Sequence, residues 1–228
     1  MYPTSPILQR TICIQTRHFL GSAFTVDVGD KLALITARHL MKDYVEGQVD
    51  EISFSTGTTF EKIKVIPHFP SSSTADITVL QTGELIDPNR FAGLELSGGH
   101  MIIGQDVYFI GFPYFGGLLE YASPELNNGF PIPLVKKACL SGFVGEVQYL
   151  DGHNNPGFSG GPVIFNAEGK QKICGVVSSF VGKPWALVAT ESTESEFVEN
   201  LGIINSYKIE LAVELLEKVY GQKPNANL

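Results

Sequence analysis

The residue best suited to covalent chemistry is Ser159, in the segment GFSGGPV at residues 157–163. A serine between glycines lies on a tight turn, where its hydroxyl can be exposed and neighbouring backbone N–H groups can converge. Converging N–H donors are what the oxyanion of a tetrahedral intermediate requires. Gly-Ser-Gly turns are also common structural features, so a nucleophile at Ser159 needs support from a base elsewhere in the chain.

The same segment matches G-x-S-x-G, the nucleophile elbow of the α/β-hydrolases. In that fold the serine leads into a helix, and the histidine follows the serine in the chain. Here Gly161-Pro162 and the apolar run VIF predict a strand after Ser159. The chain order decides the question, because no aspartate follows Ser159 and all five histidines precede it: His18, His39, His68, His100 and His153. The order His…Asp…Ser remains.

A histidine at the end of an expected strand supplies the candidate base. Residues 32–36 form an apolar stretch typical of a strand and run into T-A-R-H, which ends at His39. An imidazole titrates near neutral pH and can activate a serine that lies within about 2.6–3.2 Å. The polar loop at residues 71–74 then leads to Asp76 in D-I-T-V-L, where a carboxylate could accept the other ring N–H. Other aspartates lack this loop-to-strand setting: Asp27, Asp30, Asp43, Asp50 and Asp87.

Together these segments resemble the chymotrypsin/trypsin-like serine peptidase family, in its short, non-secreted bacterial form. T-A-R-H, preceded by G-S-A-F at residues 21–24, is similar to the family's histidine motif and the strand before it. D-I-T-V-L resembles D-[IL]-[AT]-[VL]-L, and GFSGGP resembles G-[DN]-S-G-G-P. The resemblance spans nearly the whole chain and implies a serine endopeptidase with a triad of His39, Asp76 and Ser159.

The resemblance also assigns residues to the binding of substrate. The backbone N–H groups of Gly157 and Ser159 would form the oxyanion hole. The strand through Ser178, Ser179 and Phe180 would pair with an extended peptide. His153, six positions before the serine, would occupy the floor of the specificity pocket, where it disfavours a preference for lysine or arginine and favours acidic or polar side chains.

Two positions depart from the secreted members of the family. Phe158 stands where those enzymes carry an aspartate that pairs with a new N-terminal ammonium after cleavage. Phenylalanine cannot accept that ion pair, so we expect no activation by N-terminal cleavage. Leu40 stands where they have a bridging cysteine, which is consistent with an intracellular form.

Short strands separated by turn residues indicate an all-β protein. With the resemblance, they predict two packed six-stranded β-barrels of the chymotrypsin type, at residues 1–120 and 121–228. The Gly/Pro/Asn-rich stretch at 113–133 would connect them, as a cleft rim or as a mobile loop. A C-terminal helix is expected at 206–220, capped by Ser206 and stopped by Gly221. Strands are expected at residues 11–15, 23–28, 32–36, 51–55, 62–67, 76–81, 106–111, 137–150, 162–165, 173–179 and 185–190.

The composition limits the classes of partner that the protein is expected to bind. A formal net charge of −8 and scattered basic residues argue against nucleic acid, and no apolar run approaches a membrane span. The three cysteines have no disulfide or metal spacing, and the first residues lack a signal-peptide pattern, so a cytoplasmic location is expected. No metal or organic cofactor is implied. The resemblance implies a peptide or protein substrate and a regulatory protein partner.

Two other functions compete with the enzyme. In the first, the protease fold binds a peptide or partner without turnover, which the intact triad and glycines disfavour. In the second, the C-terminal helix docks to a partner, which leaves the three motifs unexplained.

Overall fold

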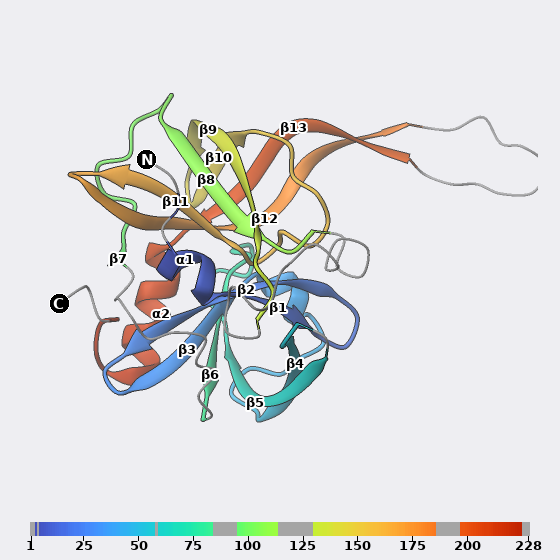
Figure 1. The fold of residues 1–228 in the computed structure, drawn as a ribbon, viewed down its shortest axis with the longest axis vertical. Coiled ribbons are helices and arrows are strands. Elements are labelled where there is room, and N and C mark those ends of the chain that lie inside the picture. Colours follow the sequence, from blue (N-terminus) through green and yellow to red (C-terminus); the bar gives the residue numbers. More distant parts are fainter. Residues whose placement is uncertain are drawn as a thin grey trace, which may run out of the picture.

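The computed structural model describes residue 3 and residues 5–57, 59–83, 95–113, 130–185 and 197–224. Two β-barrels lie one above the other in Figure 1, with the N-terminal barrel in blue and cyan and the C-terminal barrel in green to orange. The motifs with His39 and Asp76 lie in the first barrel and the motif with Ser159 in the second, so the packing between the barrels decides how the candidate site is built.

The first barrel is closed, with antiparallel neighbours in the order β1-β2-β3-β6-β5-β4. Alternation sets which side chains face inward: along β5 the buried residues are Ile63, Val65 and Pro67, with more exposed residues between them. The strands are β1 (Thr11–Gln15), β2 (Leu20–Val28), β3 (Lys31–Thr36), β4 (Asp50–Ser55), β5 (Phe60–His68) and β6 (Thr78–Thr82).

The second barrel runs in the order β11-β8-β9-β10-β13-β12 and closes through the pairing of β11 with β12. A short strand, β7 (Glu95–Leu96), adds to β12 in parallel. The two six-stranded barrels predicted from the sequence are therefore confirmed. The strands are β8 (Asp106–Gly111), β9 (Leu134–Val144), β10 (Val147–Asp151), β11 (Pro162–Ala167), β12 (Lys170–Trp185) and β13 (Phe197–Lys208).

Some expected strands were wrong in detail. Residues 137–150 form a hairpin of β9 and β10 rather than one strand, because the chain turns at Gly145, where φ is +58°. β13 was not expected, and it pairs with β12 in a long hairpin that extends beyond the barrel (Figure 1). Of the strand expected at 185–190, only Trp185 is described, at the end of β12. The boundary at residue 120 and most of the 113–133 connection lie outside the described residues.

The C-terminal helix, α2, spans Glu210–Tyr220 and ends at Gly221 in the left-handed conformation, as the sequence predicts. Ser206 is not its cap, since this serine is buried in β13, where its hydroxyl bonds Gln148. The helix begins later because the chain completes the strand first. Two short helices were not expected: α1 (Ser5–Arg10) and the 3-10 helix η1 (Arg38–Met41).

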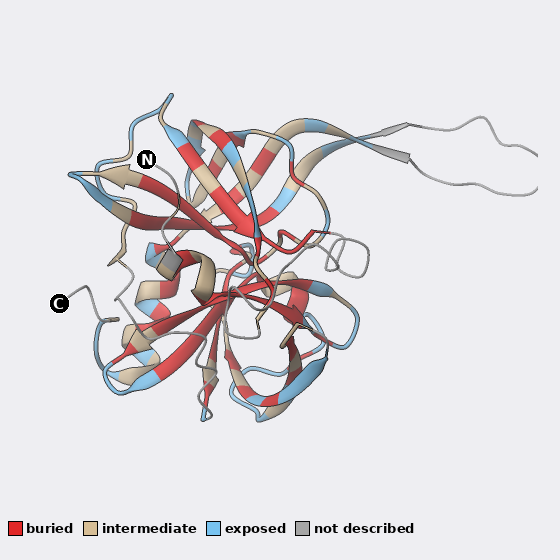
Figure 2. Ribbon diagram, viewed as in Figure 1, coloured by how far each residue is buried: buried red, intermediate tan, exposed pale blue. Residues whose placement is uncertain are grey.

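Buried residues concentrate inside both barrels and between them (Figure 2). The apolar face of α2 packs into a core cluster with strands of the first barrel and with Ile164 and Val176 of the second. The helix is therefore core structure, as its periodicity predicts. None of the helices in the described ranges is long and apolar enough to cross a membrane.

Candidate active site

The loop that carries Ser159 depends on its glycines. Gly157 and Gly160 have φ of +104° and +86°, a region that glycine enters without steric cost. A Cβ at Gly157 would collide with the carbonyl of Phe112, and one at Gly160 with the carbonyl of Ser22. The loop thus requires these glycines for conformation and for close approach.

Residues 155–158 form a turn just before the serine. The N–H of Phe158 donates to the carbonyl of Asn155 at 3.3 Å, with Pro156 second and Gly157 third in the turn. Proline at the second position and a positive φ at the third are the features of a type II turn. Among the described backbone hydrogen bonds, the N–H groups of Gly157 and Ser159 do not donate to the protein. These two donors are those assigned to the oxyanion hole.

Ser22 of β2 ties the serine loop to the first barrel. Its N–H donates to the carbonyl of Ser159 at 2.8 Å, and its hydroxyl donates to the carbonyl of Gly157 at 2.7 Å. The same hydroxyl accepts from the N–H of Phe112 at 3.0 Å. The carbonyl of Ser22 in turn accepts from the Thr36 hydroxyl at 2.6 Å. One residue of the first barrel therefore fixes both ends of the Gly157–Ser159 backbone.

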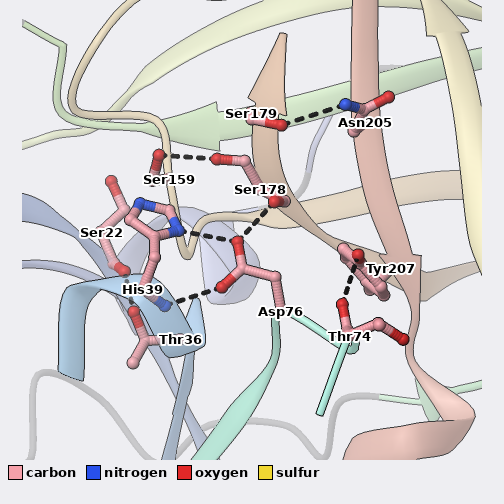
Figure 3. Close-up of polar contacts among 10 residues, drawn as sticks. All are labelled: Ser22, Thr36, His39, Thr74, Asp76, Ser159, Ser178, Ser179, Asn205 and Tyr207. Atoms are coloured by element: carbon pink, nitrogen blue, oxygen red, sulfur yellow. Dashed lines mark hydrogen bonds and ion pairs between the residues drawn. The ribbon is translucent and has the colours of Figure 1, made fainter. Parts of the chain in front are cut away.

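His39 and Asp76 form a close pair on the first barrel (Figure 3). His39 lies on η1 directly after β3, and Asp76 lies in the loop before β6. Nδ1 of His39 is 2.7 Å from Oδ2 of Asp76, and the backbone N–H of His39 donates to Oδ1 at 2.7 Å. The carboxylate thus fixes both the ring and the main chain of the histidine. The His39 side chain is 40% exposed and that of Asp76 18% exposed, so the histidine faces the solvent side.

Ser178 of β12 supplies a further donor to this pair. Its side chain is buried, and its hydroxyl donates to Oδ2 of Asp76 in a short hydrogen bond. Burial by itself raises the pKa of Asp76, but the hydrogen bonds and charge of His39 and the bond from Ser178 outweigh it. The pKa of Asp76 therefore lies below its ordinary value, and the carboxylate is held ionised.

The hydroxyl of Ser159 donates to the carbonyl of Ser178 at 2.8 Å (Figure 3). A single hydroxyl proton cannot be donated in full to both this carbonyl and the free nitrogen of His39. Rotation about the Cβ–Oγ or the Cα–Cβ bond of Ser159 would direct the proton elsewhere. In this arrangement the proton is directed at the Ser178 carbonyl.

A cavity of about 750 Å³ brings the predicted residues together. Apart from His39 and Asp76, its lining residues carry no formal charge. Its lining includes Ser159 and the predicted substrate strand, and the full set is His39, Asp76, Asn154, Asn155, Pro156, Ser159, Ser178, Ser179, Phe180 and Gly182.

His153 does not line this cavity. Its side chain is exposed, and its carbonyl accepts from Nζ of Lys136 at 2.7 Å. The prediction counted six positions back from Ser159 and so assumed that the loop has the length usual in the family. In the structure the chain turns at residues 155–158, and Asn154 and Asn155 line the wall of the cavity instead. A role for His153 in specificity gains no support from its position. The other three predicted substrate residues, Ser178, Ser179 and Phe180, do line the cavity.

Sequence reasoning missed the residues that join the barrels around the site. Ser22 lies in the G-S-A-F motif at residues 21–24, but no feature of the sequence indicated its four hydrogen bonds, which join it to Ser159, Gly157, Phe112 and Thr36. Tyr207 of β13 donates its hydroxyl to the carbonyl of Thr74 at 2.7 Å, and so supports the loop before Asp76 from the second barrel (Figure 3). These two residues lie 133 positions apart, too far for any local pattern to relate them.

Phe158 occupies the core of the second barrel. It is fully buried, and its ring meets that of Phe109 edge to face with centroids 4.9 Å apart. Its place among apolar side chains disfavours a carboxylate at this position, because a charge there would be desolvated. The backbone on either side is held by packing of the ring.

Comparison with known proteins shows the family to which the chain belongs. Residues 21–176 match the trypsin-like peptidase domain family, and because this is more than half of the chain, the protein belongs to that family. No curated protein sequence matches it at a significant level.

Solved structures share the fold. A Glu endopeptidase in complex with MPD superposes with a TM-score of 0.63 at 14% identity, over 96% of this chain and 93% of that one. The active form of the Rv3671c protease from M. tuberculosis gives 0.59 at 16%, over 97% and 86%. The HtrA-type protease AlgW with a tripeptide gives 0.59 at 19%, over 96% of this chain but 63% of that one. At these identities the similarity extends to the fold alone.

Proposed function

We propose that the protein is a serine endopeptidase that hydrolyses peptide bonds through an acyl-enzyme on Ser159. The observation that carries the proposal is the hydrogen-bonded pair of His39 and Asp76, which shares one cavity with Ser159 on a glycine-rich turn. Membership of the peptidase family supports peptides as the substrate class.

The reaction begins when the substrate backbone pairs with β12 along Ser178–Phe180. β11 pairs with β12 as far as Val176, and Gly160 and Gly161 bond the backbone of Val177, so the edge of β12 faces the cavity from Ser178 onward. An N–H of the substrate that donates to the Ser178 carbonyl competes with the Ser159 hydroxyl for that acceptor. The hydroxyl then rotates toward His39. Binding of the substrate and alignment of the nucleophile are thereby coupled.

In the chemical steps, Oγ of Ser159 attacks the scissile carbonyl as Nε2 of His39 takes its proton. Asp76 accepts from Nδ1 and stabilises the imidazolium. The N–H groups of Gly157 and Ser159 stabilise the oxyanion, and His39 returns the proton to the leaving amine. Water, activated by the same histidine, then releases the acyl group.

A fluorophosphonate probe tests the proposal. Intact protein is expected to be labelled, and labelling should disappear in Ser159→Ala. Ser179→Ala is a matched control, because Ser179 lines the same cavity but bonds only the Asn205 side chain among its described contacts. If intact protein, with folding verified, neither reacts with the probe nor cleaves any member of a peptide library, the enzyme is refuted.

A peptide-binding module without turnover is the second candidate. The hydrogen bond from Ser159 to the Ser178 carbonyl favours it, because in that arrangement the nucleophile is not directed at its base. The two candidates differ in product formation: a binding module would retain a peptide intact during long incubation.

For specificity, the uncharged wall of the cavity favours neutral side chains before the scissile bond. A peptide-library profile dominated by cleavage after arginine or lysine would contradict this.

A further inference from the structure

Lys136 of β9 contacts the segment that leads to the nucleophile. Its ammonium donates to the carbonyl of His153 at 2.7 Å and to Oδ1 of Asn155 at 2.5 Å. Lys136 lies opposite Phe109 in the pairing of β8 with β9, so its backbone is fixed in the barrel wall. A rigid strand thus holds a loop through one side chain.

The bonded groups are at the start of the turn at 155–158. Asn155 is its first residue, and the carbonyl of Asn155 closes the turn by accepting from the N–H of Phe158. Gly157, whose N–H is the proposed oxyanion donor, is its third residue. Any shift of Asn155 is therefore transmitted to the Gly157 peptide within two residues.

The ammonium also reaches the end of the turn. Nζ of Lys136 lies 5.6 Å from the centroid of the Phe158 ring, within the range of a cation–π contact. One cation therefore contacts both the first and the last residue of the turn. Burial lowers the pKa of Lys136, which indicates that its charge is partly removed from water at this place.

We propose that Lys136 is a positioning residue that holds residues 155–158 in the turn that presents the Gly157 N–H to the oxyanion. It does not touch the reacting atoms and acts through Asn155 and Phe158. This inference rests on the proposed function, because an oxyanion forms only if Ser159 attacks a carbonyl.

Lys136→Met removes the donors and the charge while keeping most of the side-chain length. The neighbouring residue gives a matched control: Lys137 is 56% exposed and pairs with Asp106 at 2.7 Å. Loss of one oxyanion donor lowers turnover about 10²–10³-fold in known cases. We expect fluorophosphonate labelling of Ser159 to slow by about 10²-fold in Lys136→Met and to be unchanged in Lys137→Met. Lys136→Arg should recover part of the rate, because a guanidinium can donate to the same oxygens.

A second pair of measurements separates positioning from stability. With a peptide substrate, Lys136→Met should lower kcat and leave KM nearly unchanged, since the peptide-binding edge of β12 is intact. Amide hydrogen exchange at residues 154–158 should become faster in Lys136→Met and not in Lys137→Met. A lower melting temperature with an unchanged labelling rate of the folded protein would overturn the proposal.

The outcomes also distinguish this inference from the proposed function. If wild-type protein is neither labelled nor cleaves any peptide, the endopeptidase proposal is refuted, and hydrogen exchange alone then decides whether Lys136 orders the turn. Unchanged exchange in Lys136→Met would overturn the inference in that case as well. If wild type is labelled and both methionine variants are labelled at the same rate, the endopeptidase proposal is supported and the proposed role of Lys136 is refuted.

Discussion

Replacement of Asp76 by asparagine tests the orientation of His39 most directly. The carboxylate accepts three hydrogen bonds: from the backbone N–H of His39, from Nδ1 of His39 and from the Ser178 hydroxyl. An asparagine has one acceptor oxygen and one NH₂ group. If the oxygen keeps the backbone bond, the NH₂ faces Nδ1 and can only donate to it. The ring must then carry its proton on Nε2, where it cannot accept from Ser159.

The expected loss of rate is large. In a triad of this kind, the change to asparagine lowers kcat about 10⁴-fold because the histidine is held in the wrong tautomer. That factor corresponds to about 5.4 kcal/mol in the activation barrier. The folded state should lose less, about 1.5–3 kcal/mol, the contribution of a hydrogen bond to a charged acceptor.

The assay compares the rate of labelling of Ser159 with the free energy of unfolding. The chain contains a matched control in His18 and Asp43, a second histidine–aspartate pair 3.2 Å apart. Their side chains are 59% and 44% exposed, so the pair contributes little to stability. Asp43→Asn should leave both the labelling rate and the free energy of unfolding nearly unchanged.

Retention of wild-type labelling within tenfold in folded Asp76→Asn would refute the reasoning. It would mean that the tautomer of His39 is set by something other than Asp76. An equal loss of labelling in Asp43→Asn would indicate a general effect of charge rather than the geometry of the pair.

Three further predictions concern stability. Phe158→Ala should lower the free energy of unfolding by about 3–5 kcal/mol in urea titration, because the ring is fully buried, and a loss under about 1 kcal/mol would contradict that packing. Trimming the chain before Thr11 should lower the melting temperature without raising the labelling rate, since it removes the buried Ile7 and Arg10; a large gain of activity would instead indicate activation by cleavage. The lowered pKa of Asp76 stabilises the fold above its ordinary pKa of 3.8, and this contribution is lost as the pH falls through the lowered value. The difference in melting temperature between wild type and Asp76→Asn should therefore shrink on acidification, and a constant difference would contradict the shift.

Much of the fold could be predicted because local patterns match it. The strands at residues 11–15 and 106–111 have the predicted ends, since each is a short segment rich in apolar residues and of strand length. The hairpin of β9 and β10 was missed because apolar residues stand on both sides of its short turn at Gly145 and Glu146, so the segment resembles one strand. β13 was missed in part because its last residues, 206–208, were assigned to the C-terminal helix, whereas they pair with β12.

In the candidate site, too, some features could be predicted from the sequence and others could not. Motif and chain order identified His39, Asp76 and Ser159, and the structure brings all three to one cavity. The place predicted for His153, on the floor of the specificity pocket, depended on the length of the loop before Ser159. Counting residues does not give the path of a loop, and His153 does not line the cavity. Ser22 could not be assigned because its partners, Gly157 and Ser159, lie in the other barrel.

The contacts between the barrels explain why the geometry of the candidate site was less predictable than the residues that form it. Asp76 of the first barrel accepts from Ser178 of the second, and the loop of Ser159 is bonded to Ser22 of the first. Each barrel therefore completes the half-site carried by the other. Sequence motifs record only the residues that each half supplies. A substitution that separates the barrels slightly should consequently impair the site before it unfolds either barrel, because hydrogen bonds weaken over a few tenths of an ångström while core packing within a barrel is retained.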